Sequence, residues 1–64
     1  MTFTLKIKCD NAAFETYPYH EVSRILQCVR EELSEGVLQA VDSQASLRLS
    51  DINGNRVGEA RWTK

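Results

Sequence analysis

The stretch that decides the fold is residues 18–36, PYHEVSRILQCVREELSEG. Its apolar residues recur at intervals of three and four, so in a helix they share one narrow stripe, made of Val22, Ile25, Leu26, Val29 and Leu33. Pro18 suits the first helical turn, where a missing N–H costs nothing, and Gly36 suits the left-handed position just past the last turn. The sequence therefore predicts one amphipathic helix, whose apolar stripe the rest of the chain must cover.

Segments on both sides of this helix alternate between apolar and polar residues, which is the pattern of a strand with one buried face. In residues 2–9 the inward positions are Phe3, Leu5, Ile7 and Cys9. In residues 45–50 the inward positions are Leu47 and Leu49. Between the first strand and the helix, the apolar patch at residues 12–14 is expected to pack against the helix start, with its phenylalanine closing one end of the core.

The last two strands are predicted to form a hairpin. Asn53-Gly54 stands at the centre of the turn at residues 51–55, and Asn-Gly between two alternating runs is the strongest short-range hairpin signal. In the returning strand the apolar residues break strict alternation across Gly58, and an isolated glycine in a strand often marks a bulge. Such a bulge would let Trp62 join the core.

The element order is strand, helix, strand, strand, in a single domain over residues 1–64 with a connector at residues 37–44. One helix stripe and one apolar sheet face satisfy each other in two layers. We therefore expect an α+β fold, a two-layer β-α-β-β arrangement with one amphipathic helix packed on a three-stranded antiparallel sheet. The order 1-3-2, with the last strand central, is favoured over a parallel crossover.

The composition is that of an ordinary globular protein, with 42% hydrophobic and 27% charged residues in 64 positions. No apolar run is long enough to span a bilayer, so a membrane protein is not expected. The start of the chain alternates and lacks the continuous apolar core of a secretory signal, which makes the cytoplasm the expected location.

Asp51, Asn53 and Asn55 occupy alternate positions and invite comparison with a calcium-binding loop, which takes oxygen ligands at positions 1, 3 and 5. That loop also needs glycine at position 6 and glutamate at position 12, where this chain has Arg56 and Trp62. A hairpin turn explains the same residues, so no metal site and no cofactor are expected here.

No catalytic arrangement can be recognised. His20 is the single histidine and has no serine or cysteine placed to form a nucleophile pair. Cys9 and Cys28 lack the spacing of metal ligands or of a redox motif, so both are expected to remain reduced thiols. A chain of this length also buries little beyond a minimal core. The sequence therefore predicts that the protein is not an enzyme.

Two charged surfaces are candidate binding sites, although a solvated face is the simpler explanation of each. The helix ends with Glu31, Glu32 and Glu35, where the helix dipole prefers cations, so this acidic end could be kept for a basic partner. The outer face of the sheet could carry five basic residues, interleaved with serine and threonine: Lys6, Lys8, Arg48, Arg56 and Arg61.

Such a basic face can hold a phosphate backbone by charge neutralisation, with hydroxyl groups as further donors. It lacks the aromatic platforms of single-strand binders, because Phe3 and Trp62 are expected to point inward. A third use follows from the sheet itself. A sheet with exposed edges can be closed by a partner or by a second copy of the chain, as a homodimer.

Several segments together resemble a family of small uncharacterised phage and prophage proteins. The segments are DNAAF at residues 10–14, Pro18, EVSRIL at residues 21–26, Leu33, Gly36 and L-x-D-x-NGN-x-VG at residues 49–58. The family typically has alanine where this chain has Ser23, and its connector is shorter than residues 37–45. The resemblance implies a phage origin and motif residues that serve as caps, turn and core.

The family has no assigned activity, but very small phage products often bind and block a host protein, including defence complexes such as CRISPR effectors. The first hypothesis is therefore a non-enzymatic accessory protein that acts by protein contact, as an anti-CRISPR-like inhibitor of a host defence system or as an inhibitor of a host enzyme. The second hypothesis is a small nucleic-acid-binding module that uses the basic sheet face.

Overall fold

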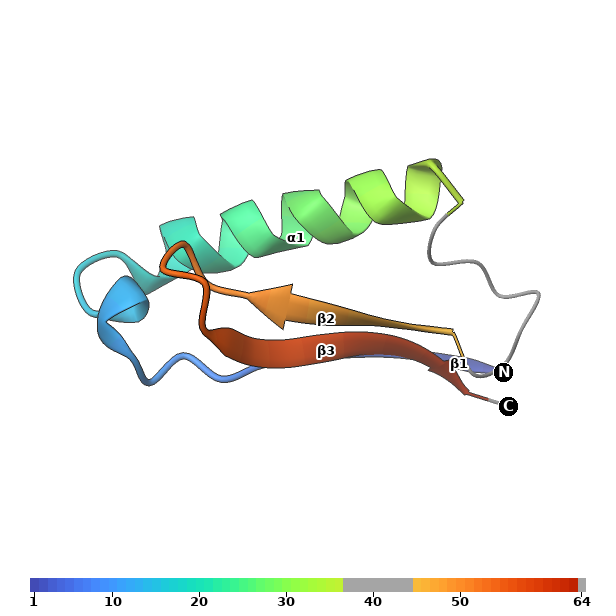
Figure 1. Cartoon of the computed structure of the whole chain (residues 1–64), viewed down its shortest axis with the longest axis horizontal. Coiled ribbons are helices and arrows are strands. Elements are labelled where there is room, and N and C mark those ends of the chain that lie inside the picture. Colours follow the sequence, from blue (N-terminus) through green and yellow to red (C-terminus); the bar gives the residue numbers. More distant parts are fainter. Residues whose placement is uncertain (37–44, 64) are drawn as a thin grey trace.

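The computed structural model describes residues 1–36 and 45–63 and places one helix on one face of a sheet (Figure 1). The elements, in chain order, are β1 (Thr2–Ile7), the 3₁₀ helix η1 (Ala12–Phe14), α1 (Pro18–Ser34), β2 (Ser46–Ser50) and β3 (Arg56–Thr63). The predicted two-layer α+β fold is thus confirmed. The connector predicted at residues 37–44 lies outside the described residues.

The sheet has the strand order β1-β3-β2, and both pairings are antiparallel. The last strand is therefore central, as predicted. Thr2 pairs with Thr63 at one end of the sheet and Ile7 pairs with Gly58 at the other. The two ends of the chain consequently lie side by side, at the opposite end of the molecule from η1 (Figure 1).

The predicted hairpin and its bulge are both present. Leu49 pairs with Gly58 but the next residue, Ser50, pairs with Arg56, so Val57 is the extra residue of β3. Val57 is buried, so the bulge directs its side chain to the core at a position where strict alternation would not place it. Gly58 sits where the backbones approach closely, because a Cβ atom there would lie 1.8 Å from the carbonyl oxygen of Lys6.

The core lies between α1 and the inner face of the sheet. Its buried apolar residues are Phe14, Ile25, Val29, Leu49, Val57 and Ala60. Phe3, Leu5, Ile7 and Trp62 are partly buried against them, with the Phe3 and Trp62 rings tilted at a centroid distance of 4.8 Å. Phe14 closes one end of the core and Trp62 joins the core, both as the sequence predicted.

α1 has a buried stripe, as predicted, but the stripe is centred on a different row of residues than the periodicity predicted. Ile25 and Val29 are buried, whereas Leu26 is 45% exposed and Leu33 is 38% exposed. The buried row instead runs through Glu21, Ile25 and Val29, which are spaced by four residues on one side of the helix. Glu21 can occupy a buried position in this row because Arg24 and the backbone N–H of Ile52 satisfy its carboxylate.

The prediction that Cys9 points inward from the first strand is wrong. β1 ends at Ile7, and Lys8 still donates its N–H to the carbonyl of Val57 at 2.7 Å before the chain leaves the sheet. Cys9 therefore lies beyond the ladder and is exposed. In the sequence the alternation of apolar and polar residues continues to Cys9, whereas β1 itself ends at Ile7.

Candidate functional site

The carboxylate of Asp51 organises the hairpin turn. Its Oδ1 accepts the backbone N–H groups of Asn53 and Asn55, both at 2.9 Å. Its Oδ2 accepts the side-chain amides of Asn11 at 2.7 Å and of Asn55 at 3.3 Å. Burial raises the pKa of Asp51, but the hydrogen bonds from Asn55, Asn53 and Asn11 outweigh it and hold the pKa below its ordinary value. The alternating Asp and Asn residues thus bind one another.

A second buried carboxylate, Glu21, joins the helix to the same turn. Arg24 contacts it through Nε at 2.8 Å and Nη2 at 3.1 Å, and the backbone N–H of Ile52 donates to its Oε2 at 2.8 Å. Arg24 also donates to the carbonyl oxygen of Ser50 at 3.1 Å. The hydrogen bond from Arg24 lowers the pKa of Glu21 and raises that of Arg24. Glu21 is therefore a structural anchor.

These two carboxylates connect the segments DNAAF, EVSRIL and DINGN that the sequence analysis singled out. Asn11 reaches Asp51 across forty positions of sequence, and Glu21 reaches Ile52 across thirty-one. Every oxygen of both carboxylates accepts at least one hydrogen bond from the protein. The arrangement fixes the geometry of the turn and leaves no carboxylate poised for acid–base chemistry in this region.

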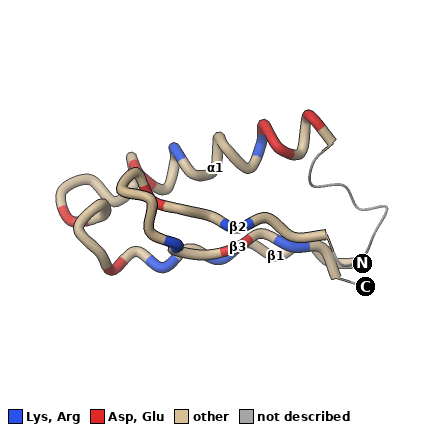
Figure 2. The backbone as a smooth tube through the Cα atoms, viewed as in Figure 1, with Lys and Arg blue, Asp and Glu red and all other residues tan. Residues whose placement is uncertain are grey.

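The three glutamates at the end of α1 line two different hollows. Glu31 and Glu35 line one shallow hollow of about 230 Å³ together with Arg30. Glu32 is half-buried and lines a different hollow beside Cys28, on the side of α1 that faces β2. Figure 2 shows the acidic positions gathered at this end of α1 with a basic position next to them. The three glutamates therefore do not form one uniform acidic surface.

Four of the five basic residues predicted for the outer face of the sheet share that face. Across the three strands Lys6 faces Glu59, which faces Arg48, and in the next row Arg61 lies between Thr4 and Ser46. Because directly paired residues share a face, the outer face carries Lys6, Arg48, Arg56 and Arg61. The sequence analysis overlooked Glu59, which stands at the centre of this face with its Oε2 at 3.8 Å from Nε of Arg61.

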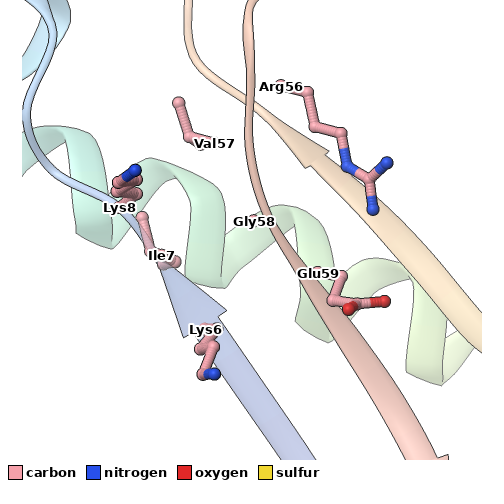
Figure 3. A pocket seen from close by; sticks show the side chains of 7 residues that line it. All are labelled: Lys6, Ile7, Lys8, Arg56, Val57, Gly58 and Glu59. Atoms are coloured by element: carbon pink, nitrogen blue, oxygen red, sulfur yellow. The ribbon is translucent and has the colours of Figure 1, made fainter.

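A shallow cavity of about 390 Å³ lies beside the bulge, between the end of β1 and the start of β3. Figure 3 shows Lys6 and Lys8 on the β1 side, Arg56 and Glu59 on the β3 side, and Gly58 between them. Three of the five predicted basic residues thus surround one hollow, with a single carboxylate among them. The arrangement can accept an anionic group of phosphate size, at the cost of repulsion from Glu59.

An exposed aromatic cluster at the start of α1 was missed by the sequence analysis. Tyr17 is 56% exposed and Tyr19 is 64% exposed, and both rings contact the His20 ring at centroid distances of 5.4 and 4.7 Å. Ile52, 69% exposed in the hairpin turn, lines a shallow cavity of about 350 Å³ with Tyr17 and His20. We call Tyr17, Tyr19, His20 and Ile52 the aromatic surface.

A signal for this surface exists in the sequence. The residues YPYH at positions 17–20 put three rings into a helix start, outside the apolar stripe that the periodicity assigned to the core. The approach of Ile52 could not be seen, because it depends on the hydrogen bond from its backbone to Glu21. His20 was weighed only as a catalytic residue, and its ring is instead part of an aromatic contact.

Three further observations concern the whole of the described chain. No helix in residues 1–36 and 45–63 is long and apolar enough to cross a membrane. Within the same residues, no group of three or more histidine, cysteine, aspartate or glutamate side chains gathers as metal ligands would. Comparison with known proteins gives no relative: no protein-family model, no curated protein and no solved structure matches the chain.

Proposed function

We propose that this chain is a non-enzymatic phage or prophage accessory protein that acts in the host cytoplasm by binding a host protein. Inhibition of a host defence complex, in the manner of an anti-CRISPR protein, or of a host enzyme is the proposed outcome of that binding. Support for the phage origin comes from the motif resemblance. The aromatic surface supports action by protein contact and is the single observation that carries this part of the proposal.

The composition of the aromatic surface is that of the central residues of protein interfaces. Tyrosine is enriched among the residues that dominate binding energy, whereas lysine and glutamate are depleted in interface cores. Tyr17, Tyr19 and Ile52 each expose more than half of their surface at one end of the molecule. Single exposed apolar residues are ordinary, but a group with adjoining rings is typical of an interaction surface.

The aromatic surface is also held in place before any partner arrives. The Tyr17 and His20 rings are stacked at an interplanar angle of 27°, and Tyr19 meets His20 edge-on. The turn that carries Ile52 is anchored by Glu21 and Asp51. Side chains that are already ordered lose less conformational entropy on binding, so a given contact area yields more affinity.

The test is affinity capture from host lysate with the wild-type protein and with a Tyr17→Ala, Tyr19→Ala variant. We expect wild type to retain a protein partner in stoichiometric amount and the variant to bind that partner at least about tenfold more weakly. A Glu31→Ala, Glu35→Ala variant serves as the control, since it removes two exposed side chains at the other end of α1. Unchanged thermal unfolding of both variants shows that the fold is intact.

Three results would contradict the proposal. Retention of the same partner by the tyrosine variant would remove the aromatic surface from the contact. Failure of the wild type to retain any stoichiometric protein, in every host tested, would count against action by protein contact itself. Loss of the partner only in the glutamate variant would instead assign the contact to the acidic end of α1.

A second candidate function is nucleic-acid binding, favoured by the shared outer face of Lys6, Arg48, Arg56 and Arg61 and by Lys8 at the adjoining cavity. It is tested by titrating labelled DNA and RNA against salt. Binding that weakens steeply with salt and is lost in a Lys6→Glu, Arg48→Glu variant supports this function. Glu59→Gln should strengthen such binding, because it removes the carboxylate that lies between Lys6 and Arg48. No binding at low salt removes the candidate.

A further inference from the structure

The two edges of the sheet differ in what their backbones offer. Lys8 donates its N–H to Val57, and the paired register places the N–H and C=O groups of Thr2, Thr4 and Lys6 toward β3 in the same way. Successive residues of a strand alternate sides, so Phe3, Leu5 and Ile7 direct their backbone groups to the free edge of β1. Within residues 1–36 and 45–63, no strand pairs with that edge.

The other edge, on β2, is partly covered. Arg24 donates to the carbonyl oxygen of Ser50, and α1 approaches the sheet most closely at β2. Cys28 and Glu32, on the same flank of the helix as Arg24, line a hollow with β2 residues. α1 is therefore displaced toward β2 and away from β1.

The displacement of α1 leaves apolar surface beside the free edge. Leu26 and Leu33 lie about half a turn around the helix from Arg24, at about 100° per residue, so they project from the flank opposite β2. Both are more than one-third exposed. On the sheet below, Phe3, Leu5 and Ile7 are only partly buried. An unpaired backbone edge thus adjoins an incompletely covered apolar strip.

We propose that β1 pairs with β1 of a second copy of this chain, antiparallel about a two-fold axis through Leu5. The sheet then continues through six strands, and both helices lie on the same face. In this register Leu5 pairs with Leu5 of the second copy and Phe3 with Ile7, and all three direct free backbone groups across the seam. Leu26 and Leu33 of the two copies approach one another above it.

Self-pairing is supported by the charges on the outer face of the same strand. With Leu5 at the axis, Lys6 stands opposite Thr4 of the second copy, and Lys8 stands opposite Thr2. No lysine therefore faces a lysine directly across the seam. Like charges directly opposite each other would destabilise the pair. The apolar inner residues meet apolar residues at the same time. One strand is thus complementary to itself on both faces.

The first test changes the charge at the seam without touching the core. Thr4→Lys places a like charge opposite Lys6 twice in the dimer, and Thr4→Glu places an opposite charge there twice. Sedimentation equilibrium should show the wild type dimerising, Thr4→Lys weakening the dimer about fivefold and Thr4→Glu strengthening it about fivefold. Ser46→Lys and Ser46→Glu are matched controls, because Ser46 flanks Arg61 on β2 as Thr4 does on β1.

The second test reads the register directly. In a Cys9→Ser, Cys28→Ser background, Thr4→Cys combined with Lys6→Cys should yield a disulfide-linked dimer on mild oxidation, because the two positions face each other across the seam. Thr4→Cys alone should not yield a disulfide-linked dimer. In this register the position-4 residues of the two copies are diagonal neighbours, and they lie too far apart to bridge. Cross-linking by Thr4→Cys alone would overturn the Leu5-centred register.

A purified protein that stays monomeric at millimolar concentration would overturn the dimer and leave the edge for a strand of another protein. Assembly that responds to Ser46 variants and not to Thr4 variants would assign it to β2 and equally overturn the proposal. The dimer does not rest on the proposed host contact, because the aromatic surface shares no residue with the seam. Loss of host binding in the tyrosine variant should accordingly leave sedimentation unchanged.

Discussion

Two glycines of this chain are required for different reasons. Gly54 has φ of +87° in the hairpin turn and open space around its missing Cβ, so its requirement is conformational. Gly58 has no positive φ, but a Cβ would collide with the Lys6 carbonyl at 1.8 Å, and backbone cannot move aside without breaking the ladder. Its requirement is steric and belongs to the β1–β3 pairing.

We therefore predict that Gly58→Ala destabilises the protein more than Gly54→Ala. The turn substitution should cost about 1–2 kcal/mol of unfolding free energy from backbone strain, whereas the strand substitution should cost more than about 2 kcal/mol because it separates two strands. Urea denaturation of both variants, followed by the fluorescence of the single tryptophan, measures the difference. Equal stability of Gly58→Ala and wild type would contradict the close approach. Gly54→Asn, which tolerates the left-handed conformation, should restore much of the loss seen with alanine.

The turn shows how far single residues can be predicted. Asn53-Gly54 predicted the hairpin because turn chemistry is local, and the sequence also placed Asp51 in the turn. That Asp51 binds Asn11 could not be predicted, since the contact joins residues forty positions apart and depends on how η1 packs. Local dihedral preferences are written in neighbouring residues, whereas such distant hydrogen bonds are products of the finished fold.

At the scale of elements, the helix gives the clearest contrast between buried and exposed positions. Ile25 is 2% exposed, and we predict that Ile25→Ala costs about 2–5 kcal/mol. This loss is comparable with the entire stability expected of so short a chain, so a substantial unfolded population should be visible by circular dichroism. Leu26→Ala removes as many carbon atoms from a side chain that is 45% exposed and should cost less than about 1 kcal/mol.

The paired comparison tests the position of the buried row. Similar losses in the two variants would indicate that the stripe is centred between Ile25 and Leu26, as the sequence periodicity alone suggests. Periodicity identifies residues that share a face, but it cannot choose the centre of that face when a polar residue is buried. Glu21 shifted the centre here, because Arg24 and the Ile52 backbone satisfy it.

The strands were predictable in alternation but less so in extent and register. Alternation placed Lys6 and Arg48 on the outer face and left Arg61 only as a residue that could share it; the pairing of the strands sets all three in neighbouring rows. The position of Glu59 between Lys6 and Arg48 required the register across three strands, which depends on the bulge at Val57. The end of β1 depended on the partner strand as well, which is why Cys9 was misplaced.

For the whole molecule, the buried carboxylates of Glu21 and Asp51 predict stability that depends on pH. Folding lowers the pKa of both carboxyl groups. In the unfolded chain these pKa values are about 4, so below about pH 5 the unfolded chain binds more protons than the folded chain. Stability is therefore fully present near neutral pH and is lost progressively as pH falls through the unfolded and then the folded values. Urea midpoints measured from pH 7 to pH 2.5 should decrease with acidification.

The matched variant for this prediction is Glu21→Gln, which keeps the shape of the side chain and removes one titrating group. It should be less stable than wild type at neutral pH and should lose less stability on acidification, so that the two curves converge at low pH. Parallel curves for the two proteins would show that Glu21 does not contribute to the pH dependence. Asp51→Asn offers the same comparison for the turn.

β3 is the partner of both other strands and yet comes last among them along the chain. During synthesis on a ribosome, β1 and α1 emerge first, but β1 has no pairing partner until β3 has left the exit tunnel, because Thr2 pairs with Thr63 and Ile7 with Gly58. Local helix can form in the nascent chain, while the long-range pairing must wait for the final strand. The sheet can therefore assemble only after β3 has become available, so its formation depends on the last of the three strands.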